Sequence, residues 1–459
     1  MPENAQLFID DSSDVKGGPF ASGQTNGHAS VQDALFEDSL FCAQCHEVTN
    51  PLLTWKNAAG DVLGAKFPAE RTYTEWKNSA FAVPGEDFAS CQDCHMKKAA
   101  TPGLAASTGE QPRELHSHEL VGGNTIAPLM VAHLQQGPSV PPFLANLGDD
   151  AQRIVDAAER QLKEQSALLS LQGNDLAAQE IVVRVENKTG HKLPTGYAEG
   201  RRMWVGHSVT AAGGVVSSKA GTPDPVTFDF VEDPARVYEI KLGDESGPSF
   251  HFIEVDRIYK DNRLPPRGFR PTPDTAPVAH DFGTAPDGSM YHYDDVTLPL
   301  GDIDCFPAVV DVKLYYQTAS GEYFRFLRDN APVRGPQLAE AWNAVGGGVP
   351  VVMQEIQFTL FADGTTQEGG GPYTCETPID DAGVASDAGP VTVDAGVGKD
   401  GGTADDDAGE VLVDGGTTPS PEPEPPADCS CSSSSDGSPT FAFLLFIGVF
   451  GVRLRWARG

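Results

Sequence analysis

Two five-residue segments combine cysteine and histidine at a spacing that can attach haem. Residues 42–46 and 91–95 both read Cys-X-X-Cys-His. The two-residue gap lets both thiols add to the vinyl groups of one haem, and the histidine that follows can bind the iron. Each segment therefore predicts one covalently bound haem c. The expected attachment residues are Cys42, Cys45 and His46 for the first haem, and Cys91, Cys94 and His95 for the second.

A zinc site built from both Cys-X-X-Cys pairs is the rival interpretation of these segments. Paired zinc ligands are usually separated by roughly 12–20 residues. The pairs that begin at Cys42 and Cys91 lie much further apart, and a histidine follows each of them directly. The spacing favours haem.

Electron transfer and catalysis differ in whether a side chain occupies the second axial position of each iron, because an open position admits substrate. The stronger candidates for this second ligand are His28, His118 and His191, and the weaker ones are His116 and His133. We expect ordinary roles for His207, His251, His280 and His292, and a packing role for Met96. Glu70, Glu75 and Glu119 could act as acids beside a haem, but a solvated surface position is the stronger expectation for each.

The elements that must position these residues change in character along the chain. Residues 1–145 are rich in Gly, Pro, Asn and Asp and show no strand alternation, whereas apolar residues recur at helical spacing over 149–169. Beyond Gly173 the period changes to two. The expected strands include 181–186, 203–210, 226–230, 308–318, 323–328 and 351–361, which favour an antiparallel β-sandwich.

The C-terminal part has a different composition. From Asp363 to Asp428 the chain fills with Asp, Gly, Ala, Thr and Pro, which is typical of a disordered spacer. A short apolar run, 441–452, and three arginines follow Cys429 and Cys431, and the run is shorter than the roughly 20 residues of a membrane span.

We expect an α+β multidomain chain. Its parts are a mostly irregular and helical haem domain (1–148), a connecting helix (149–178), a β-sandwich (179–362), an acidic linker (363–428) and a C-terminal anchor segment (429–459).

The net charge of −33 argues against nucleic acid as a partner. About half of the acidic excess falls in the stretch from Asp363 to Asp428, whose one basic residue is Lys399. The segments expected to fold are therefore only moderately acidic, and the overall charge says little about their binding surfaces.

The cysteines point to an oxidising, extracytoplasmic compartment, where haem c is attached and disulfides form. Cys305 and Cys375 stand apart from the pentapeptides, and we expect a disulfide between them.

Residues 1–40 hold no basic start followed by an apolar stretch, so no signal peptide is recognisable. We therefore expect the true start of the protein to lie upstream of Met1.

Several segments resemble the multihaem cytochromes related to hydroxylamine oxidoreductase and the tetrahaem nitrification cytochromes. These segments are 41–47, 50–51, 70–77, 91–96, 118–124, 187–196 with 201–204, 264–269 and 313–318. The resemblance covers roughly residues 14–360 and implies haem-bearing stretches followed by a β-sandwich. Members typically carry a further attachment motif upstream of a segment like 14–20, and its absence here supports truncation. The catalytic branch uses a cross-linked tyrosine, for which Tyr73 and Tyr197 are available but not diagnostic.

The segment from Cys429 to Gly459 is similar to the C-terminal sorting tail of myxobacterial surface proteins, with cysteines, a short apolar run and terminal arginines. The resemblance implies processing near Cys429 or Cys431 and display at the outer surface. The expected partners are then redox proteins or other cytochromes, with the outer membrane or cell surface reached through the tail.

Three functions follow from these features. The first is an extracytoplasmic multihaem cytochrome c that carries electrons. The second is a haem enzyme that acts on hydroxylamine or small nitrogen oxides at an open iron. The third is a binding module in which the haems are structural. Electron transfer is the main expectation, since it requires no substrate site.

Overall fold

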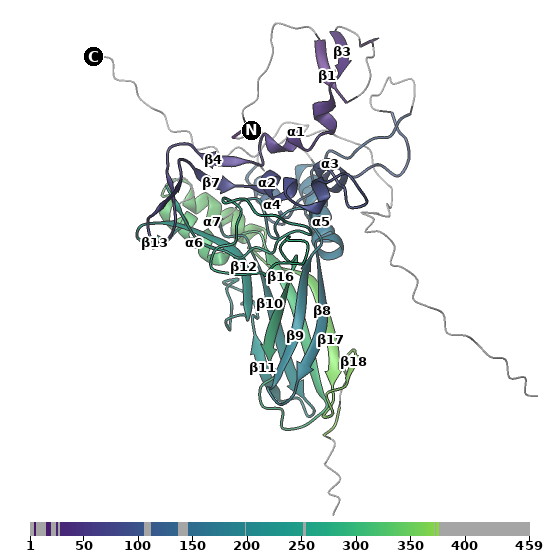
Figure 1. Cartoon of the computed structure of the whole chain (residues 1–459), viewed down its shortest axis with the longest axis vertical. Helices are drawn as coiled ribbons and strands as arrows, with labels where there is room; N and C mark the ends of the chain where they lie inside the picture. Colours follow the sequence, from purple (N-terminus) through teal and green to yellow (C-terminus); the bar gives the residue numbers. More distant parts are fainter. Residues whose placement is uncertain are drawn as a thin grey trace, which may run out of the picture.

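The computed structural model describes residues 4–5, 15–19, 24–25, 28–104, 112–135, 146–197, 199–250, 254–371 and 373–375. Runs of strands and runs of helices follow one another along these residues, and the sheets are mainly antiparallel, so the chain belongs to the α+β class, as expected. Figure 1 shows long strands that run away from a smaller, irregular region, which carries the N-terminal helices at one end of the sheets.

The larger sheet has ten strands. Its main path runs β18-β17-β16-β10-β12-β14-β5-β6, with β11 beside β10 and β13 beside β12. In chain order these strands are β5 (Trp55–Lys56), β6 (Val62–Gly64), β10 (Arg202–Ala211), β11 (Val216–Ala220), β12 (Arg236–Asp244), β13 (Gly247–Pro248), β14 (Arg257–Asp261), β16 (Ala308–Gln317), β17 (Val351–Leu360) and β18 (Thr366–Glu368). Neighbouring strands are antiparallel except β14 and β5, which are parallel.

A smaller sheet of three antiparallel strands packs against the larger one. Its order is β15 (Tyr293–Pro299), β9 (Glu180–Asn187) and β8 (Ala167–Asp175). Alternate residues of β9, namely Ile181, Val183 and Val185, are fully buried and belong to the same apolar cluster as Val310 and Val312 of β16. The period of two along these strands therefore places one face of each sheet in a shared core.

The segment with the pentapeptides consists of short elements. They are β1 (Val15–Gly18), β2 (Gln24–Thr25), β3 (His28–Gln32), η1 (Ala34–Glu37), α1 (Leu40–Ala43), β4 (Val48–Asn50), β7 (Phe67–Glu70), α2 (Thr72–Lys77), η2 (Ala80–Ala82) and α3 (Cys91–His95). Its strands β5 and β6 extend the larger sheet. This arrangement anchors the pentapeptide segment to the β-rich part of the chain.

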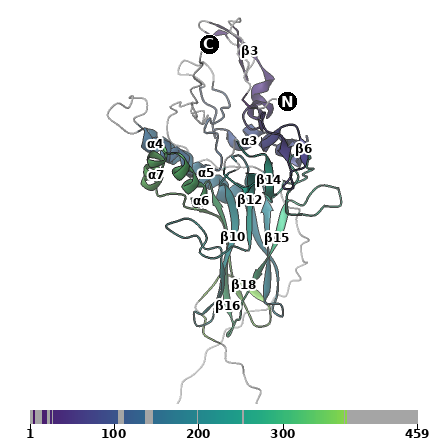
Figure 2. The same cartoon turned by 90° about the vertical axis from the view of Figure 1, so that its left-hand side faces the viewer.

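Four further helices lie together beside the sheets, as Figure 2 shows. They are α4 (Ala127–Leu134), α5 (Leu147–Gln165), α6 (Gly321–Asn330) and α7 (Gly335–Ala344). Helix α4 packs against α5 and α7, and α6 packs against α7. The buried residues of α5, among them Val155, Ala158 and Leu162, recur at helical spacing, as the sequence predicts.

The predicted helix over 149–169 is too long at its C-terminal end. Helix α5 ends at Gln165, and β8 begins at Ala167. The side chain of Ser166 donates a hydrogen bond to the carbonyl of Gln161, 2.8 Å away. Leu169 is buried as expected, but as a strand residue in the core shared by the two sheets.

Two of the predicted strands are wrong. Residues 323–328 belong to helix α6, because the side chain of Ser320 caps the helix by accepting a hydrogen bond from the N–H of Tyr323. Residues 226–230 form a turn, in which the carboxylate of Asp224 accepts the N–H groups of Val226 and Thr227. The lack of strands predicted before residue 145 is also wrong, since β1–β7 lie there.

A disulfide joins Cys305 and Cys375, whose Cα atoms are 5.5 Å apart. This is the pair that the sequence analysis singles out. It ties the chain after β18 to the loop that precedes β16. The predicted linker and sorting tail beyond residue 375 lie outside the described residues.

Candidate haem site

The two pentapeptides lie against each other although they are about 50 residues apart in the sequence. The Oγ of Ser39 accepts a hydrogen bond from the N–H of Cys91 at 3.0 Å. The amide of Gln92 donates to the carbonyl groups of Phe36 and Asp38, at 3.2 and 2.9 Å. These bonds hold helix α3 beside the turn that leads into α1, so the attachment residues form one site.

One thiol from each pentapeptide takes part in this contact, because Cys42 and Cys91 hydrogen bond to each other. The bond from Cys42 lowers the pKa of Cys91 to about 7, with a further contribution from Ser39. The same bond, together with burial, raises the pKa of Cys42. Cys42, Cys45, Cys91 and Cys94 are not in disulfides, so all four thiols are available for thioether bonds.

The two pentapeptide histidines share one hydrogen-bonding arrangement. The Nδ1 of His46 lies 3.1 Å from Oε1 of Glu70, and Nδ1 of His95 hydrogen bonds to the carbonyl oxygen of Val121. A proton on Nδ1 satisfies both oxygen acceptors and leaves Nε2 with its lone pair. Such a partner on the second ring nitrogen is typical of histidines that bind metals.

His191 and His116 repeat the arrangement. The Nδ1 of His191 lies 2.9 Å from the carbonyl oxygen of Lys192, and Nδ1 of His116 lies 2.8 Å from that of Met96. Burial, with a contribution from nearby His95, lowers the pKa of His191 to about 4. His191 is therefore neutral near pH 7, which is the form that ligates metal.

In the β-rich region, three histidines present Nε2 to a polar neighbour, and Nε2 of His280 does so without a hydrogen bond. The Nε2 of His207 lies 3.0 Å from Oγ of Ser218. The Nε2 atoms of His280 and His292 face carboxylates at 3.7 and 3.6 Å. His116 also has a carboxylate near Nε2, with Oε1 of Glu114 at 3.9 Å, so it differs from these histidines only in its bound Nδ1.

The imidazole rings of His95 and His191 are nearly parallel, with an interplanar angle of 15° and centroids 6.2 Å apart. Aromatic rings in ordinary offset contact also have centroids about 4.5–7 Å apart. With a metal–nitrogen bond of about 2 Å and a ring radius of about 1 Å, two imidazoles bound to one ion would have centroids roughly 6 Å apart. The two rings are therefore neighbours, at a spacing that two ligands of one metal ion can have.

The remaining candidate histidines are placed differently. His28 begins β3, and its side chain is outside the described part of the structure. His118 is exposed in the loop between α3 and α4. His133 lies on α4 with Nε2 3.8 Å from Oε1 of Glu340 on α7, so it faces the helical cluster.

A buried cluster of charges lies beside the His191 loop, and the sequence analysis missed it. Glu75, expected at the surface, is completely buried, as is Lys192. Oε1 of Glu75 pairs with Arg263 at 2.9 Å, and Nζ of Lys192 pairs with Asp261 at 2.8 Å. The one signal in the sequence that could have pointed to this cluster is that Lys192 directly follows His191, a candidate haem ligand. The cluster joins helix α2 of the pentapeptide segment to the end of β14.

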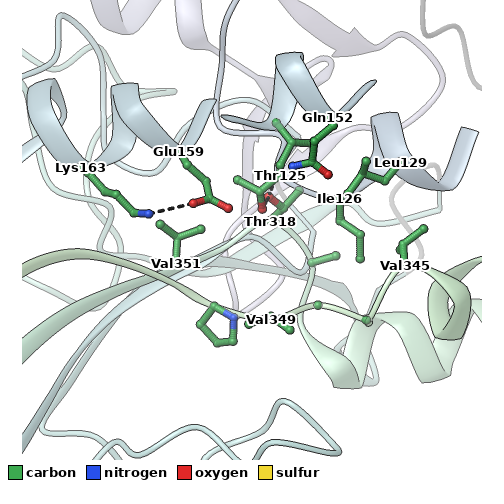
Figure 3. A pocket seen from close by; sticks show the side chains of 15 residues that line it. Thr125, Ile126, Leu129, Gln152, Glu159, Lys163, Thr318, Val345, Val349 and Val351 are labelled. Carbon is green, nitrogen blue, oxygen red and sulfur yellow. Dashed lines mark hydrogen bonds and ion pairs between the residues drawn. The ribbon is translucent and has the colours of Figure 1, made fainter. Parts of the chain in front are cut away.

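A separate hollow of about 360 Å³ lies between the helices and the loop before β17. Figure 3 shows Thr125, Thr318 and several aliphatic side chains around it, with the ion pair of Glu159 and Lys163 at one side. No residue of either pentapeptide lines it. The hollow is therefore separate from the two pentapeptides.

Two features are absent from the described residues. Their His, Cys, Asp and Glu side chains form no group of three or more that could hold a metal ion. Within the same residues, every helix is too short or too polar to cross a membrane.

Comparison with known proteins gives one distant similarity. No family model matches the chain, and no curated protein does. Among solved structures, a penta-haem cytochrome c552 from Thermochromatium tepidum is similar, with a TM-score of 0.39 and 16% sequence identity. The match covers 74% of this chain and 62% of that chain, so this chain spans less than two thirds of that structure.

Proposed function

We propose that this protein is an extracytoplasmic multihaem cytochrome c that carries electrons through covalently bound haem. The observation that carries the proposal is the paired pentapeptide site. Two complete Cys-X-X-Cys-His segments lie against each other, and His46 and His95 both have Nδ1 bound to an oxygen atom. Haem c supplies the redox centre. The chain's own residues hold the haem, orient its ligands and set its environment.

Each haem has its own set of protein ligands in this proposal. Cys42 and Cys45 attach the first haem and His46 binds its iron, while Cys91, Cys94 and His95 hold the second. His191 would be the second ligand of the iron held by His95, which is supported by their nearly parallel rings with centroids 6.2 Å apart. Candidates for the second ligand of the first iron are His116, whose Nδ1 is already bound, His28 and His118.

The proposed location rests on chemistry that belongs outside the cytoplasm. Haem c is attached after export, and the disulfide between Cys305 and Cys375 suits an oxidising compartment. The partners would be other redox proteins, and residues 429–459 would attach the chain to the cell surface.

The decisive experiment is expression in a host that matures haem c, followed by absorption spectroscopy and peptide mass spectrometry. We expect haem on the peptides that contain residues 42–46 and 91–95. The double variants C42A/C45A and C91A/C94A should each lose one haem and keep the other. A chain that binds no covalent haem in this host would overturn the proposal, and bound zinc in its place would support the rival interpretation.

A further inference from the structure

Arg201, the residue before β10, has a buried donor that the proposed haem ligation does not explain. Its Nη1 donates a hydrogen bond to the carbonyl of Thr195 at 2.6 Å. Its Nε is buried and has no hydrogen-bond partner among the residues that the structure describes. Leaving such a donor unsatisfied is costly, and native proteins rarely do so without a reason.

The backbone around Arg201 is shaped to receive the guanidinium group. Gly196 has a φ of +85°, a conformation that favours glycine. A Cβ on Gly196 would lie 2.6 Å from Nη1 of Arg201. Any larger residue at position 196 would therefore displace the guanidinium, so the turn and the arginine form one unit.

A chain of polar contacts connects this unit to the first pentapeptide. Oε1 of Glu70 lies 3.1 Å from Nδ1 of His46 and accepts the hydroxyl of Thr72 at 3.2 Å. The Oγ1 of Thr72 lies 2.9 Å from Oγ1 of Thr195, whose carbonyl accepts the hydrogen bond from Arg201.

The carboxylates around this region already have partners. Glu70 is bound to His46 and Thr72, and Glu75 pairs with Arg263 and accepts the hydroxyl of Thr195. Within the described part of the chain, Arg201 forms no ion pair with any carboxylate. A guanidinium with a free donor beside a ligand site suits a carboxylate brought by the ligand, because the planar fork of arginine matches a carboxylate.

We propose that Arg201 binds a propionate carboxylate of the haem attached at Cys42 and Cys45. This inference rests on the proposed function, since haem carries the propionates. A cation held beside the haem favours the reduced, less positive iron. Arg201 is thus a positioning residue that orients the porphyrin edge and raises the reduction potential of that haem.

The test is spectroelectrochemistry of the holoprotein and its variants R201Q and R201K, with covalent haem measured in each sample. We expect R201Q to keep both haems and to lower the potential of one of them. The expected shift is a tenfold change in the ratio of reduced to oxidised haem, which is about 59 mV for one electron. R201K keeps the charge and should shift less. The control R184Q, which removes an arginine paired with Asp295 on the β15–β9 surface, should leave both potentials unchanged.

The outcomes separate this inference from the function that it rests on. R201Q with two haems at wild-type potentials would overturn the role of Arg201 and leave the cytochrome function intact. A wild-type chain without covalent haem would overturn both. If R201Q does not fold, resonance Raman spectra of R201K decide. A shifted propionate bending band would support the contact, and an unchanged band would refute it.

Discussion

Glu75 on α2 and Arg263, which follows β14, form a buried ion pair with Oε1 and Nη2 2.9 Å apart. The second carboxylate oxygen of Glu75 accepts the N–H of Lys192 and the hydroxyl of Thr195, at 3.2 and 2.7 Å. One side chain thus holds together the pentapeptide segment, the sheet and the loop that carries His191. The position of this histidine depends on contacts between residues more than 100 positions apart.

Removing the carboxylate of Glu75 should therefore lower the free energy of unfolding. Breaking a buried ion pair leaves the partner charge uncompensated, which typically costs about 3–5 kcal/mol. We expect E75A to lower the free energy of unfolding by this amount, measured by urea unfolding followed by circular dichroism. The matched control is E159A, which removes a carboxylate from the exposed pair with Lys163 and should cost no more than about 0.5 kcal/mol. Equal losses in the two variants would contradict the role of Glu75.

The same cluster predicts how stability depends on pH. Burial raises the pKa of Asp261, but the cations Arg263 and Lys192 outweigh this effect and hold the pKa well below its usual range. The folded state therefore binds the Asp261 proton less readily than the unfolded chain, in which the pKa is about 3.9. The stabilisation from Asp261 is complete above that pKa and is lost as the pH falls through the folded value. We expect the unfolding free energy to fall from pH 5 to pH 2.5, and to fall less steeply in D261N. Parallel curves would contradict this assignment.

Loss of the disulfide should destabilise the β-rich region. The bond closes a loop between residues 70 positions apart, and such a cross-link typically contributes about 2–4 kcal/mol. We expect C305S/C375S to unfold at correspondingly lower urea concentration and to keep its covalent haem. Peptide mapping of the unreduced wild type should recover the linked peptides. Free thiols at both positions would show that the bond does not form.

The proposed distal role of His191 predicts a change of spin state. Replacement of His191 by alanine should open one iron coordination site and convert one of two low-spin haems to high spin, as detected by electron paramagnetic resonance. The variant H133A, which changes a histidine that faces Glu340 on α7, should keep the wild-type spectrum. An unchanged spectrum for H191A would exclude His191 as a ligand. A high-spin haem in the wild type would favour the enzyme that acts on hydroxylamine or nitrogen oxides.

The sequence predicted the features that depend on short spacing. The pentapeptides are local patterns, and β16 and β17 were expected within one residue because alternate apolar positions continue through both strands. Helix α6 was missed because Tyr323, Phe324 and Phe326 suggested a strand, whereas the cap at Ser320 starts a helix.

The details of the site could not be predicted because they depend on tertiary contacts. Glu75 meets Arg263 and Lys192 only after the chain folds, and nothing near Glu75 in the sequence marks it as buried. The donor of Arg201 is likewise visible only from the turn at Gly196. The proposal that His191 is a distal ligand likewise depends on the ring geometry of His95 and His191, which the sequence does not show.

Glu70 gives a last prediction, opposite in sign to that for Arg201. A carboxylate that accepts the Nδ1 proton of His46 makes the imidazole a stronger electron donor, which favours oxidised iron and lowers the reduction potential. We expect E70Q to raise the potential of the haem that R201Q lowers, while E70D, which keeps the charge, shifts it less. The control E355Q removes a carboxylate paired with Lys313 on the sheet and should change neither potential. Spectroelectrochemistry of the three variants would contradict the arrangement if E70Q lowered the potential or moved that of the other haem.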